Sequence, residues 1–326
     1  MKAAVYRRYG GPEVVSVAEL ADPVCGADQV LVKVLATTVS AADRRIRAAS
    51  FPRGMAIFAR LVFGAFRPRK PVLGTELAGR VVKVGAKVTR WWVGDEVIAQ
   101  TGARLGAHAE LVVLREDSAM TRRPEGLDVV SAAALAFGGT TALYFLRDLG
   151  GLRPGQRVLV LGGAGVVGSA AIQLARHLGA HVDATCSSGQ GERVRALGAE
   201  RVFEPTRDPG LDFGQLDPAY DLIVDTADIT TLRACRKALT RDGRLLMVAA
   251  DLPAMLRMVL NPFRKQKALA GVVPERADDL AYLAALAASG HYRPAIDSVF
   301  PLADIVQAHT RAETRGRVGS VVVQLG

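Results

Sequence analysis

Short alternating or β-branched apolar runs follow one another over the first part of the chain, up to about residue 122. They are "KAAVYRR", "QVLVKVLATTVS", "LAGRVVKVG", "DEVIAQ" and "HAELVVL", and turn-forming glycine, proline and aspartate separate them. A period of two places the apolar side chains on one face of a strand, so these runs favour strands over helices. The pattern therefore predicts a β-rich first region.

The pattern changes after Pro124-Glu125-Gly126, first to helical stretches and then, from Gln156 onward, to alternating strands and helices. The strands are the buried runs "RVLVLG", "HVDATC", "RVFEP", "DLIVDT" and "GRLLMVA". Such alternation is typical of a parallel, doubly wound α/β sheet. Residues 292–326 then return to a strand, a helix and a final strand. We predict a β-rich domain over 1–122, completed by 292–326, and a doubly wound domain over 123–291.

A glycine-rich turn follows the first strand of the second region. The residues fit G-x-G-x-x-G and are Gly163, Ala164, Gly165, Val166, Val167 and Gly168. In a dinucleotide fingerprint the first glycine allows the tight turn, the second lets the pyrophosphate approach, and the third lets the helix pack on the strand. We expect the helix over about 169–178, with its N-terminal amides facing the phosphates. The alternative is a glycine-rich turn of another α/β protein.

Charge and cysteine content exclude several classes of function. The net charge of +10 comes mostly from two stretches without acidic residues, 51–70 and 252–267, so the rest of the chain is nearly balanced. We therefore predict no nucleic-acid partner. The N-terminus lacks a signal-peptide apolar region, and the three cysteines form no C-x-x-C pair. A cytoplasmic protein without a disulfide framework is expected.

The order of several motifs resembles one known family along essentially the whole chain. The motifs are "PVLGTELAGRVVKVG", "VGDEVIA", "GAHAELVVL", "SAAALAFGGTTALYFL", "GQRVLVLGGAGVVGSAAIQLARHLGA" and "LGAERVFEP". They resemble the medium-chain dehydrogenase/reductase superfamily, and most of all its zinc-free quinone oxidoreductase-like branch. The resemblance implies a GroES-like catalytic domain and a Rossmann domain, with the active site in the cleft between them and a homodimeric assembly.

The residues that hold zinc in other branches of this superfamily differ here. The zinc branch has Gly-His-Glu where this chain has Gly74-Thr75-Glu76, and its cysteines would fall near Asp43 and near Phe137 or Gly138. A catalytic zinc needs Cys, His or carboxylate ligands, so we expect no metal. Hydride transfer from a nicotinamide to an apolar quinone or α,β-unsaturated carbonyl needs no Lewis acid. For Glu76 a buried structural salt bridge is expected.

The resemblance also suggests catalytic residues. Asp43 matches the aspartate of the Asn-Pro-x-Asp motif of quinone reductases, although Ser40-Ala41 replaces Asn-Pro, and the alternative for Asp43 is a helix cap. We take Asp43 and Thr75 as the catalytic candidates. For His108 we favour a packed histidine at a strand edge over a proton donor.

Further candidates would edge the nicotinamide. Thr141 matches a threonine beside the cofactor in relatives, with capping of the following helix as the alternative. Asp225 and Thr226 end a strand, so they should border the nicotinamide pocket, and Gly319 and Ser320 are expected to approach it from the returning C-terminal segment.

The end of the second strand predicts the choice of cofactor. NAD-selective sites place a carboxylate there, whereas this chain has Ser187 and Ser188, with Arg193 as the nearest cation. Asp183 lies three residues too early to reach the ribose. We predict NADPH rather than NADH, although a tyrosine frequent in NADPH-using quinone reductases is replaced by Pro205. A solvated surface turn is the alternative.

Residues 51–70 interleave apolar side chains with arginines between the Asp43 motif and Gly74. We predict a helical lid whose Phe58 and Phe63 face the acceptor. The alternatives are an amphipathic helix that covers the domain core and a basic apolar helix that contacts anionic lipid.

The sequence thus predicts a zinc-independent NADPH-dependent reductase of quinones or enones. The alternatives are a catalytically weak NADPH-binding protein that docks on a membrane or protein partner, and an alcohol dehydrogenase.

Overall fold

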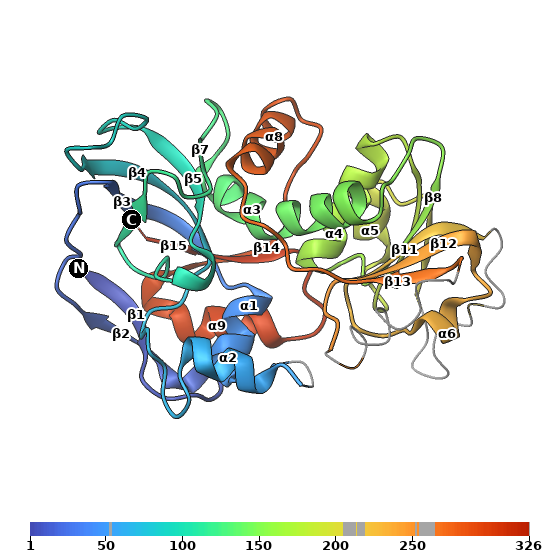
Figure 1. The fold of residues 1–326 in the computed structure, drawn as a ribbon, viewed down its shortest axis with the longest axis horizontal. Coiled ribbons are helices and arrows are strands. Elements are labelled where there is room, and N and C mark those ends of the chain that lie inside the picture. Colours follow the sequence, from blue (N-terminus) through green and yellow to red (C-terminus); the bar gives the residue numbers. More distant parts are fainter. Residues whose placement is uncertain (52–53, 205–212, 214–218, 252, 254–264, 326) are drawn as a thin grey trace.

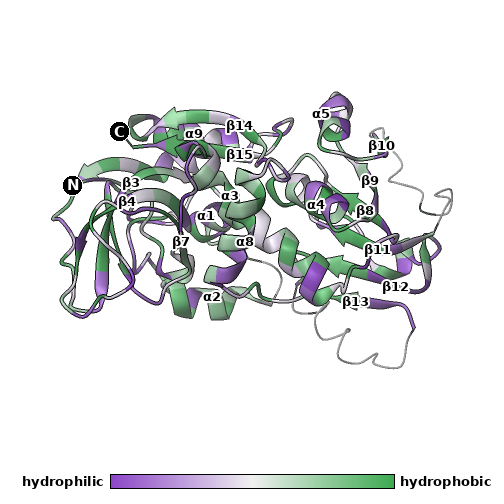
Figure 2. Ribbon diagram, turned by 90° about the horizontal axis from the view of Figure 1, so that it is seen from above, coloured by the Kyte–Doolittle hydropathy of each residue, from purple (hydrophilic) through white to green (hydrophobic). Residues whose placement is uncertain are grey.

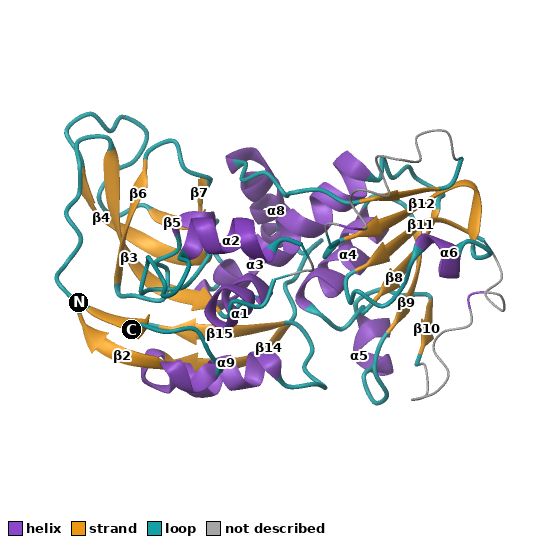
Figure 3. Cartoon of the chain, turned by 60° about the horizontal axis from the view of Figure 1, so that its bottom comes forward, coloured by secondary structure: helices purple, strands orange, loops and turns teal. Residues whose placement is uncertain are grey.

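The structure, a computed structural model, describes residues 1–51, 54–204, 213, 219–251, 253 and 265–325. It has two lobes, each built around its own larger sheet, and the N-terminus and the last strand lie in the same lobe (Figure 1). Helices α1 (Ala41–Ala48) and α3 (Val129–Leu143) lie between the two sheets (Figure 3). The predicted combination of a β-rich part and a doubly wound part is confirmed.

The first lobe contains a seven-stranded sheet with the order β14-β15-β3-β4-β5-β7, in which β6 also pairs with β3. The C-terminal strand β15 runs antiparallel to β3, with Val322 opposite Thr38. The chain end therefore completes the first sheet, as the sequence predicts. A two-stranded sheet, β1-β2, lies beside it. The strands are β1 (Lys2–Tyr6), β2 (Val15–Glu19), β3 (Gln29–Thr38), β4 (Glu76–Val84), β5 (Glu96–Gln100), β6 (Leu111–Arg115), β7 (Met120–Arg122), β14 (Ile296–Pro301) and β15 (Ser320–Gln324).

The second lobe contains a six-stranded sheet with the order β10-β9-β8-β11-β12-β13, and every pair in it is parallel. From the central strand β8 the chain first adds β9 and β10 on one side and then adds β11, β12 and β13 on the other side. The direction in which strands are added therefore reverses between β8 and β11. Ligands of doubly wound sheets bind outside the carboxyl ends of the strands at such a point. The strands are β8 (Arg157–Leu161), β9 (His181–Thr185), β10 (Arg201–Phe203), β11 (Tyr220–Asp225), β12 (Leu239–Met247) and β13 (Lys267–Leu269).

Helix α3 joins the two lobes and is apolar on nearly all sides. It continues into a π-helical segment, Tyr144–Leu149. The combined helix Val129–Leu149 is long and apolar enough to span a membrane, but 72% of its most apolar stretch is buried inside the protein. A Cβ atom at Gly138 would lie 2.8 Å from the carbonyl oxygen of Val166. The absence of a side chain at Gly138 therefore lets α3 approach the start of α4.

The remaining helices flank the sheets. The helix after the glycine-rich turn begins three residues earlier than the sequence predicts, because Gly165 already serves as its N-cap. These helices are α2 (Ala56–Phe63), α4 (Val166–His177), α5 (Gly191–Ala196), α6 (Leu232–Cys235), α8 (Ala277–Ala288) and α9 (Ile305–Glu313). We propose the domain boundaries at 122/123 and 291/292, which agree with the membership of the strands in the two sheets.

Candidate functional site

The glycine-rich turn between β8 and α4 makes its sharp bend at Gly162. Gly162 has φ of +82°, a left-handed conformation that side chains disfavour, whereas Gly163 has no such angle. The prediction that Gly163 allows the tight turn is therefore wrong. Gly163 is a packing glycine, since a Cβ atom there would lie 2.9 Å from Ile172 Cδ1. The signal for Gly162 was present in the sequence, because glycines recur every third residue at 162, 165 and 168.

The third glycine lets the helix approach the turn. A Cβ atom at Gly168 would lie only 2.2 Å from the carbonyl oxygen of Gly162, so α4 could not keep its position with any side chain there. The first helical hydrogen bond runs from Ser169 N to Gly165 O, at 2.8 Å. The amides of Val166, Val167 and Gly168 precede it, so they are available to an anion at the positive end of the helix dipole.

The ends of neighbouring strands support this turn. Thr185, the last residue of β9, accepts hydrogen bonds from Gly162 N at 3.1 Å and from Gly163 N at 2.7 Å. Thr226 follows β11 and donates to Leu161 O at 2.8 Å. Gly319, just before β15, donates its amide to Ala164 O at 2.9 Å. The returning C-terminal segment thus contacts the turn directly, and Ser320 lies buried next to it.

Asp225 and Thr226 take different places. Asp225 is buried and accepts hydrogen bonds from the amides of Ala227, Ile229 and Thr230, each at 3.0 Å. Its carboxylate therefore stabilises the loop that follows β11. Burial raises the pKa of Asp225. Thr226 instead lines a cavity next to the turn. The expected role at the nicotinamide edge therefore fits Thr226 better than Asp225.

This cavity has a volume of about 410 Å³, and both lobes line it. A second cavity of about 310 Å³ shares Arg45, Ile46, Phe63, Val248, Ala249 and Gly271 with it, so the two form one continuous cleft. The combined space suits a nicotinamide and a small acceptor. Further lining residues are Thr75 and Gln100 from the first lobe, Phe137, Thr140 and Thr141 from α3, and Val167 and Thr226 from the second lobe.

Thr141 and Thr140 lie well inside α3, far from its N-cap, Asp128. The capping alternative for these threonines is therefore wrong. Thr140 Oγ1 accepts a hydrogen bond from Gln100 Nε2 at 3.0 Å and donates to Ala136 O at 2.8 Å. Thr141 is buried and lies in the cavity wall, where a residue beside a cofactor is expected.

Asp43 is buried at the start of α1, where both of its carboxylate oxygens are engaged. Its Oδ2 accepts from Ser40 N at 2.8 Å and from Ser40 Oγ at 2.6 Å, and its Oδ1 accepts from Gly74 N at 2.8 Å. Asp43 is the third helical residue in a capping box with Ser40. Ser40 rather than Asp43 is therefore the N-cap residue of α1, and Asp43 supports that cap from the third helical position without lining the cleft.

Thr75 brings a hydroxyl group to the cavity wall from the position next to Gly74. Its Oγ1 lies 3.3 Å from Ser40 Oγ, which donates to the carboxylate of Asp43. Because Ser40 gives its proton to Asp43, the Thr75 hydroxyl can donate its single proton either to Ser40 Oγ or to an acceptor oxygen in the cleft. Asp43 contacts this region through Ser40 and through the amide of Gly74. Of the two catalytic candidates, only Thr75 reaches the cleft.

Glu76 forms no salt bridge with any residue that the structure describes, so the salt-bridge prediction is wrong. The carboxyl group is 1% exposed and bonds to the hydroxyl of Thr38 and the amide of Phe137. Burial raises the pKa of Glu76 to about 8. A neutral carboxylic acid therefore connects β4 to α3 at neutral pH.

His108 is fully buried, and its Nε2 lies 2.9 Å from Thr38 O. Its ring meets the ring of His309 edge-on, with centroids 5.6 Å apart, and burial lowers the pKa of His309 to about 2. The Nδ1 atom of His309 lies 2.9 Å from Arg47 Nη1. The favoured prediction of a packed histidine is confirmed, because His108 contacts core residues and does not line the cleft.

The predicted lid contains a helix, α2. It differs both from a lid in which Phe58 and Phe63 face the acceptor and from a helix that covers the domain core. Phe63 lines both cavities and stacks on Phe51 with ring centroids 6.1 Å apart, whereas Phe58 is 63% exposed and lies in neither wall. The prediction for Phe58 is therefore wrong. No residue of α2 is buried, and within α2 the contact with the core of the first lobe is made by Phe63 at its C-terminal end. Figure 2 shows its largely apolar residues at the edge of the molecule.

The expected 2′-phosphate region is an exposed turn. Ser187, Ser188 and Arg193 are all exposed, while Asp183 is buried inside β9, where it accepts from Tyr220 Oη at 2.7 Å and from Arg201. The carboxylate of Asp183 is thus engaged inside the lobe, and its distance from the ribose stays a prediction. Pro205 lies outside the described residues.

A carboxylate that the sequence reasoning missed contacts this turn. Glu204 Oε2 accepts a hydrogen bond from Gly189 N at 3.1 Å. Glu204 follows β10, so it comes close to the end of β9 only because the two strands are neighbours. Arg45 and Glu275, which line the main cavity, were missed as well. Burial lowers the pKa of Arg45 and raises the pKa of Glu275, and no sequence motif marked either.

The positions aligned with zinc ligands do not fit a metal. Asp43 is fully engaged with Ser40 and Gly74, Thr75 offers a neutral hydroxyl, and Phe137 and Gly138 offer no side-chain ligand. Within the described ranges, no group of three or more His, Cys, Asp or Glu side chains is close enough to hold a metal ion. The glycines of the turn, in contrast, fit a dinucleotide, since a side chain at Gly162 or Gly168 would be strained or would clash.

Comparisons with known proteins agree with this geometry. Residues 26–146 match the alcohol dehydrogenase GroES-like domain, residues 145–242 the C-terminal domain of alanine dehydrogenase/PNT, and residues 197–323 the zinc-binding dehydrogenase family. The chain is 31% identical to the chloroplastic NADPH-dependent alkenal/one oxidoreductase of Arabidopsis thaliana, over 99% of this chain and 79% of that protein. It is 30% identical to the quinone oxidoreductase of Lama guanicoe, over 100% of this chain and 98% of that protein.

A solved structure supports the same assignment. The quinone oxidoreductase of Coxiella burnetii superimposes with a TM-score of 0.88 and 26% identity, over 100% of this chain and 99% of that one. The relatives and the solved structure extend over both lobes and the cleft between them. The chain therefore belongs to the medium-chain dehydrogenase/reductase superfamily, in its quinone oxidoreductase-like branch.

Proposed function

We propose that this protein is a zinc-independent, NADPH-dependent reductase of quinones or α,β-unsaturated carbonyl compounds. The observation that carries the proposal is the cleft at the carboxyl ends of β8 and β11. Its walls are mostly small apolar and hydroxyl side chains, and it begins at the glycine-rich turn. The names of the Arabidopsis and Lama relatives support the same class of acceptor.

In this proposal the protein orients two reactants instead of activating one of them through a metal. The nicotinamide, when bound, supplies the hydride, and an acceptor that is already electron-poor needs little more than alignment. The hydroxyl of Thr75, positioned by Ser40 and Asp43, is the candidate donor to the acceptor oxygen. Thr141 and Thr226 line the cavity, and in this proposal they border the nicotinamide.

The test is NADPH oxidation across a panel of ortho-quinones, naphthoquinones and enones, with wild type and Thr75→Val side by side. We expect turnover of conjugated acceptors, and a lower kcat in the variant with little change in NADPH affinity. Elemental analysis of the purified protein accompanies the assay. About one zinc per chain, lost together with activity on chelation, would contradict the metal-free mechanism.

Preference for NADPH over NADH is part of the proposal. Ser187 and Ser188 are exposed at the end of β9, and Arg193 is exposed in α5. Hydroxyl groups and a guanidinium are suitable donors to a 2′-phosphate. The phosphate would compete with the carboxylate of Glu204 for the amide of Gly189. Glu204 is therefore expected to limit the preference that Arg193 creates.

Replacing Arg193 with alanine should weaken NADPH binding about fivefold and leave NADH binding unchanged, because an exposed charge-assisted contact contributes about 1 kcal/mol. Glu204→Gln should act in the opposite direction and tighten NADPH binding alone. Dissociation constants of both cofactors by fluorescence titration provide the measurement. Equal affinities for NADPH and NADH in the wild type, or equal losses for both in Arg193→Ala, would refute the preference.

A second prediction concerns Phe63 in the cleft wall. Phe63→Ala should raise KM severalfold for bulky acceptors and less for small ones, because it removes an apolar wall of both cavities. Phe58→Ala is the matched control, since Phe58 lies on the same helix and outside the cleft. Steady-state kinetics with a small enone and a naphthoquinone measure the difference. The same change for both acceptors, or for both variants, would contradict a lining role.

One observation favours a second function. The α2 side chains Ile57, Phe58, Leu61 and Val62 are between 56% and 74% exposed, and Arg60 lies among them. This face would let a catalytically weak NADPH-binding protein dock on an anionic membrane. Absence of turnover across the panel, together with sedimentation on anionic vesicles, would favour that function.

We also propose that the protein is cytoplasmic and forms a homodimer. Light scattering, which measures the molar mass in solution, tests the dimer.

A further inference from the structure

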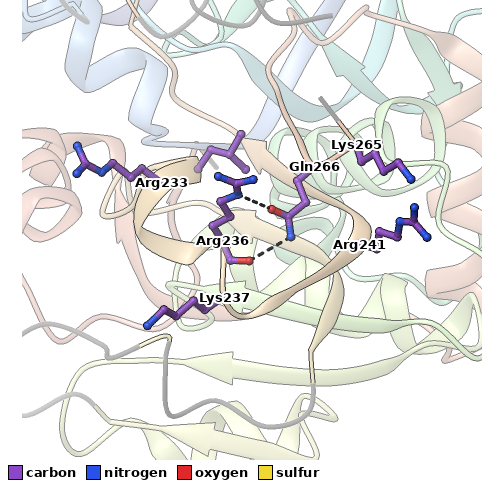
Figure 4. Close-up of a pocket in the computed structure, with 7 residues that line it drawn as sticks. Arg233, Arg236, Lys237, Arg241, Lys265 and Gln266 are labelled. Carbon is purple, nitrogen blue, oxygen red and sulfur yellow. Dashed lines mark hydrogen bonds between the residues drawn. The ribbon is translucent and has the colours of Figure 1, made fainter. Parts of the chain in front are cut away.

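A separate cavity of about 740 Å³ lies in the second lobe, on a face that the cleft does not use. Figure 4 shows Arg236 and Gln266 in its middle, with Arg233 and Lys237 on one side and Arg241 and Lys265 on the other. The residues come from α6, the start of β12 and the segment just before β13. Five of these six side chains are cationic.

Among the residues that the structure describes, no carboxylate lines this cavity. None of the five pairs with a carboxylate among the residues that the structure describes. Asp221, within β11, and Asp242, next to Arg241, do not pair with them. Asp221 accepts from Arg157 N at 2.9 Å and from Thr240 Oγ1 at 3.4 Å, and Asp242 forms no described ion pair although it follows Arg241. Like charges gathered in one depression repel one another, so an anion would stabilise them.

The floor of the cavity is held in place by Gln266. Its Nε2 donates to three carbonyl oxygens, those of Arg236 at 3.1 Å, Leu239 at 3.2 Å and Thr240 at 3.0 Å. Its Oε1 accepts from Arg236 Nε at 3.1 Å, as the dashed lines in Figure 4 show in part. Gln266 thus orients the guanidinium of Arg236 through its Nε atom. Within the described part of the chain, the two NH₂ groups of Arg236 have no hydrogen-bond partner, so they can bind a ligand.

This cavity is distinct from the cofactor cleft. Arg236 and Lys237 precede β12 and Lys265 precedes β13, whereas Val248, in the cleft wall, follows β12. The cavity therefore lies at the amino ends of these parallel strands and the cleft at their carboxyl ends. The cavity and the cleft are therefore separated by the length of a strand.

We propose that this cavity binds a soluble anion with two or more adjacent phosphate groups, of the size of a nucleoside diphosphate or triphosphate. Guanidinium groups match the paired oxygens of phosphate, and the three arginines and two lysines can share several negative charges. The volume of about 740 Å³ is that of a small-molecule site. The lining residues that the structure describes include no aromatic side chain, and so offer no stacking surface of the kind that a single-stranded nucleic-acid site uses.

The probe for the test is tripolyphosphate, titrated by calorimetry into the full chain saturated with NADPH, so that the cofactor site is filled. We expect saturable binding that weakens with added salt, since the cations are exposed. Arg241→Gln with Lys265→Gln should weaken it about tenfold or more, because two charged contacts are lost. The matched control is Arg7→Gln with Arg8→Gln, which removes the same charge from another exposed place. Reductase activity and melting temperature should stay unchanged in both variants.

Three results would overturn the proposal. They are absence of saturable tripolyphosphate binding to the NADPH-saturated wild type, an equal loss in the two double variants, and release of bound NADPH as tripolyphosphate binds. Sedimentation with phosphatidate vesicles serves as a parallel measurement. Vesicle binding that the Arg241 and Lys265 changes abolish, without tripolyphosphate binding, would identify a lipid surface as the source of phosphate and refute a soluble ligand.

Discussion

Replacing Gly168 with alanine should lower the free energy of unfolding by about 3 kcal/mol and abolish measurable NADPH binding. The new Cβ atom would lie 2.2 Å from the carbonyl oxygen of Gly162, and this neighbour is backbone, which cannot rotate away. Either α4 moves off β8 or the turn at Gly162 opens. Both changes displace the amides that we expect to face the pyrophosphate. Urea unfolding without cofactor and a cofactor titration measure the two effects.

Gly165→Ala separates folding from binding in the same turn. A Cβ atom at Gly165 would meet only the carbonyl oxygen of Gly162 at 3.4 Å, an ordinary contact, and its φ of −70° suits any residue. We therefore expect nearly wild-type stability. NADPH affinity should still fall about tenfold or more, because the methyl group occupies the path by which the pyrophosphate approaches the backbone. Unchanged NADPH affinity in Gly165→Ala would contradict the placement of the cofactor on this turn.

Replacing Glu76 with glutamine should stabilise the protein by about 3 kcal/mol at pH 7. The pKa of this buried carboxyl group is raised from 4.5 to about 8. Below pH 4.5 the group is protonated in both states, so it adds no pH dependence there. Between 4.5 and 8 the unfolded chain releases the proton while the folded protein retains it. The free energy of unfolding of the wild type therefore falls as the pH rises through this window.

Glutamine can replace the neutral acid, since its oxygen can accept from the Phe137 amide. Its NH₂ group can donate to Thr38 Oγ1 once the Thr38 hydroxyl, which donates to Glu76 in the wild type, has rotated. The stability gain should be near zero at pH 4.5 and grow by about 1.4 kcal/mol per pH unit up to pH 8. Urea unfolding at pH 5, 7 and 8 measures it, with the exposed Glu125→Gln as control. A destabilisation by Glu76→Gln that is constant with pH would show that the carboxylate is ionised when folded.

Local sequence patterns predicted the elements that depend on local interactions. Alternating runs became strands, and the glycine spacing after β8 marked the turn and the helix after it. The location of the bend was still wrong by one residue, at Gly163 instead of Gly162. The positive φ of Gly162 depends on how the chain leaves β8 and bonds to Thr185 of β9, which is a contact across the sheet.

Single side chains far apart in sequence were harder to place. Phe58 and Phe63 belong to one apolar pattern, yet only Phe63 faces the cleft, because the orientation of α2 depends on packing against the rest of the lobe. Glu204 reaches the serine turn because β10 pairs with β9. Glu76 has no cation beside it among the described residues, and its partners Thr38 and Phe137 come from β3 and α3.

The sequence by itself determined the two-part architecture, the family and the location of the dinucleotide turn, because periodicity and glycine spacing are local properties of the chain. Only the tertiary structure decided that Asp43 supports the N-cap of α1 while Thr75 reaches the cleft, and that Glu76 is a neutral acid. It also brought five cations from separate segments around one cavity. Burial, protonation and charge clustering depend on which surfaces pack together, so no local pattern records them.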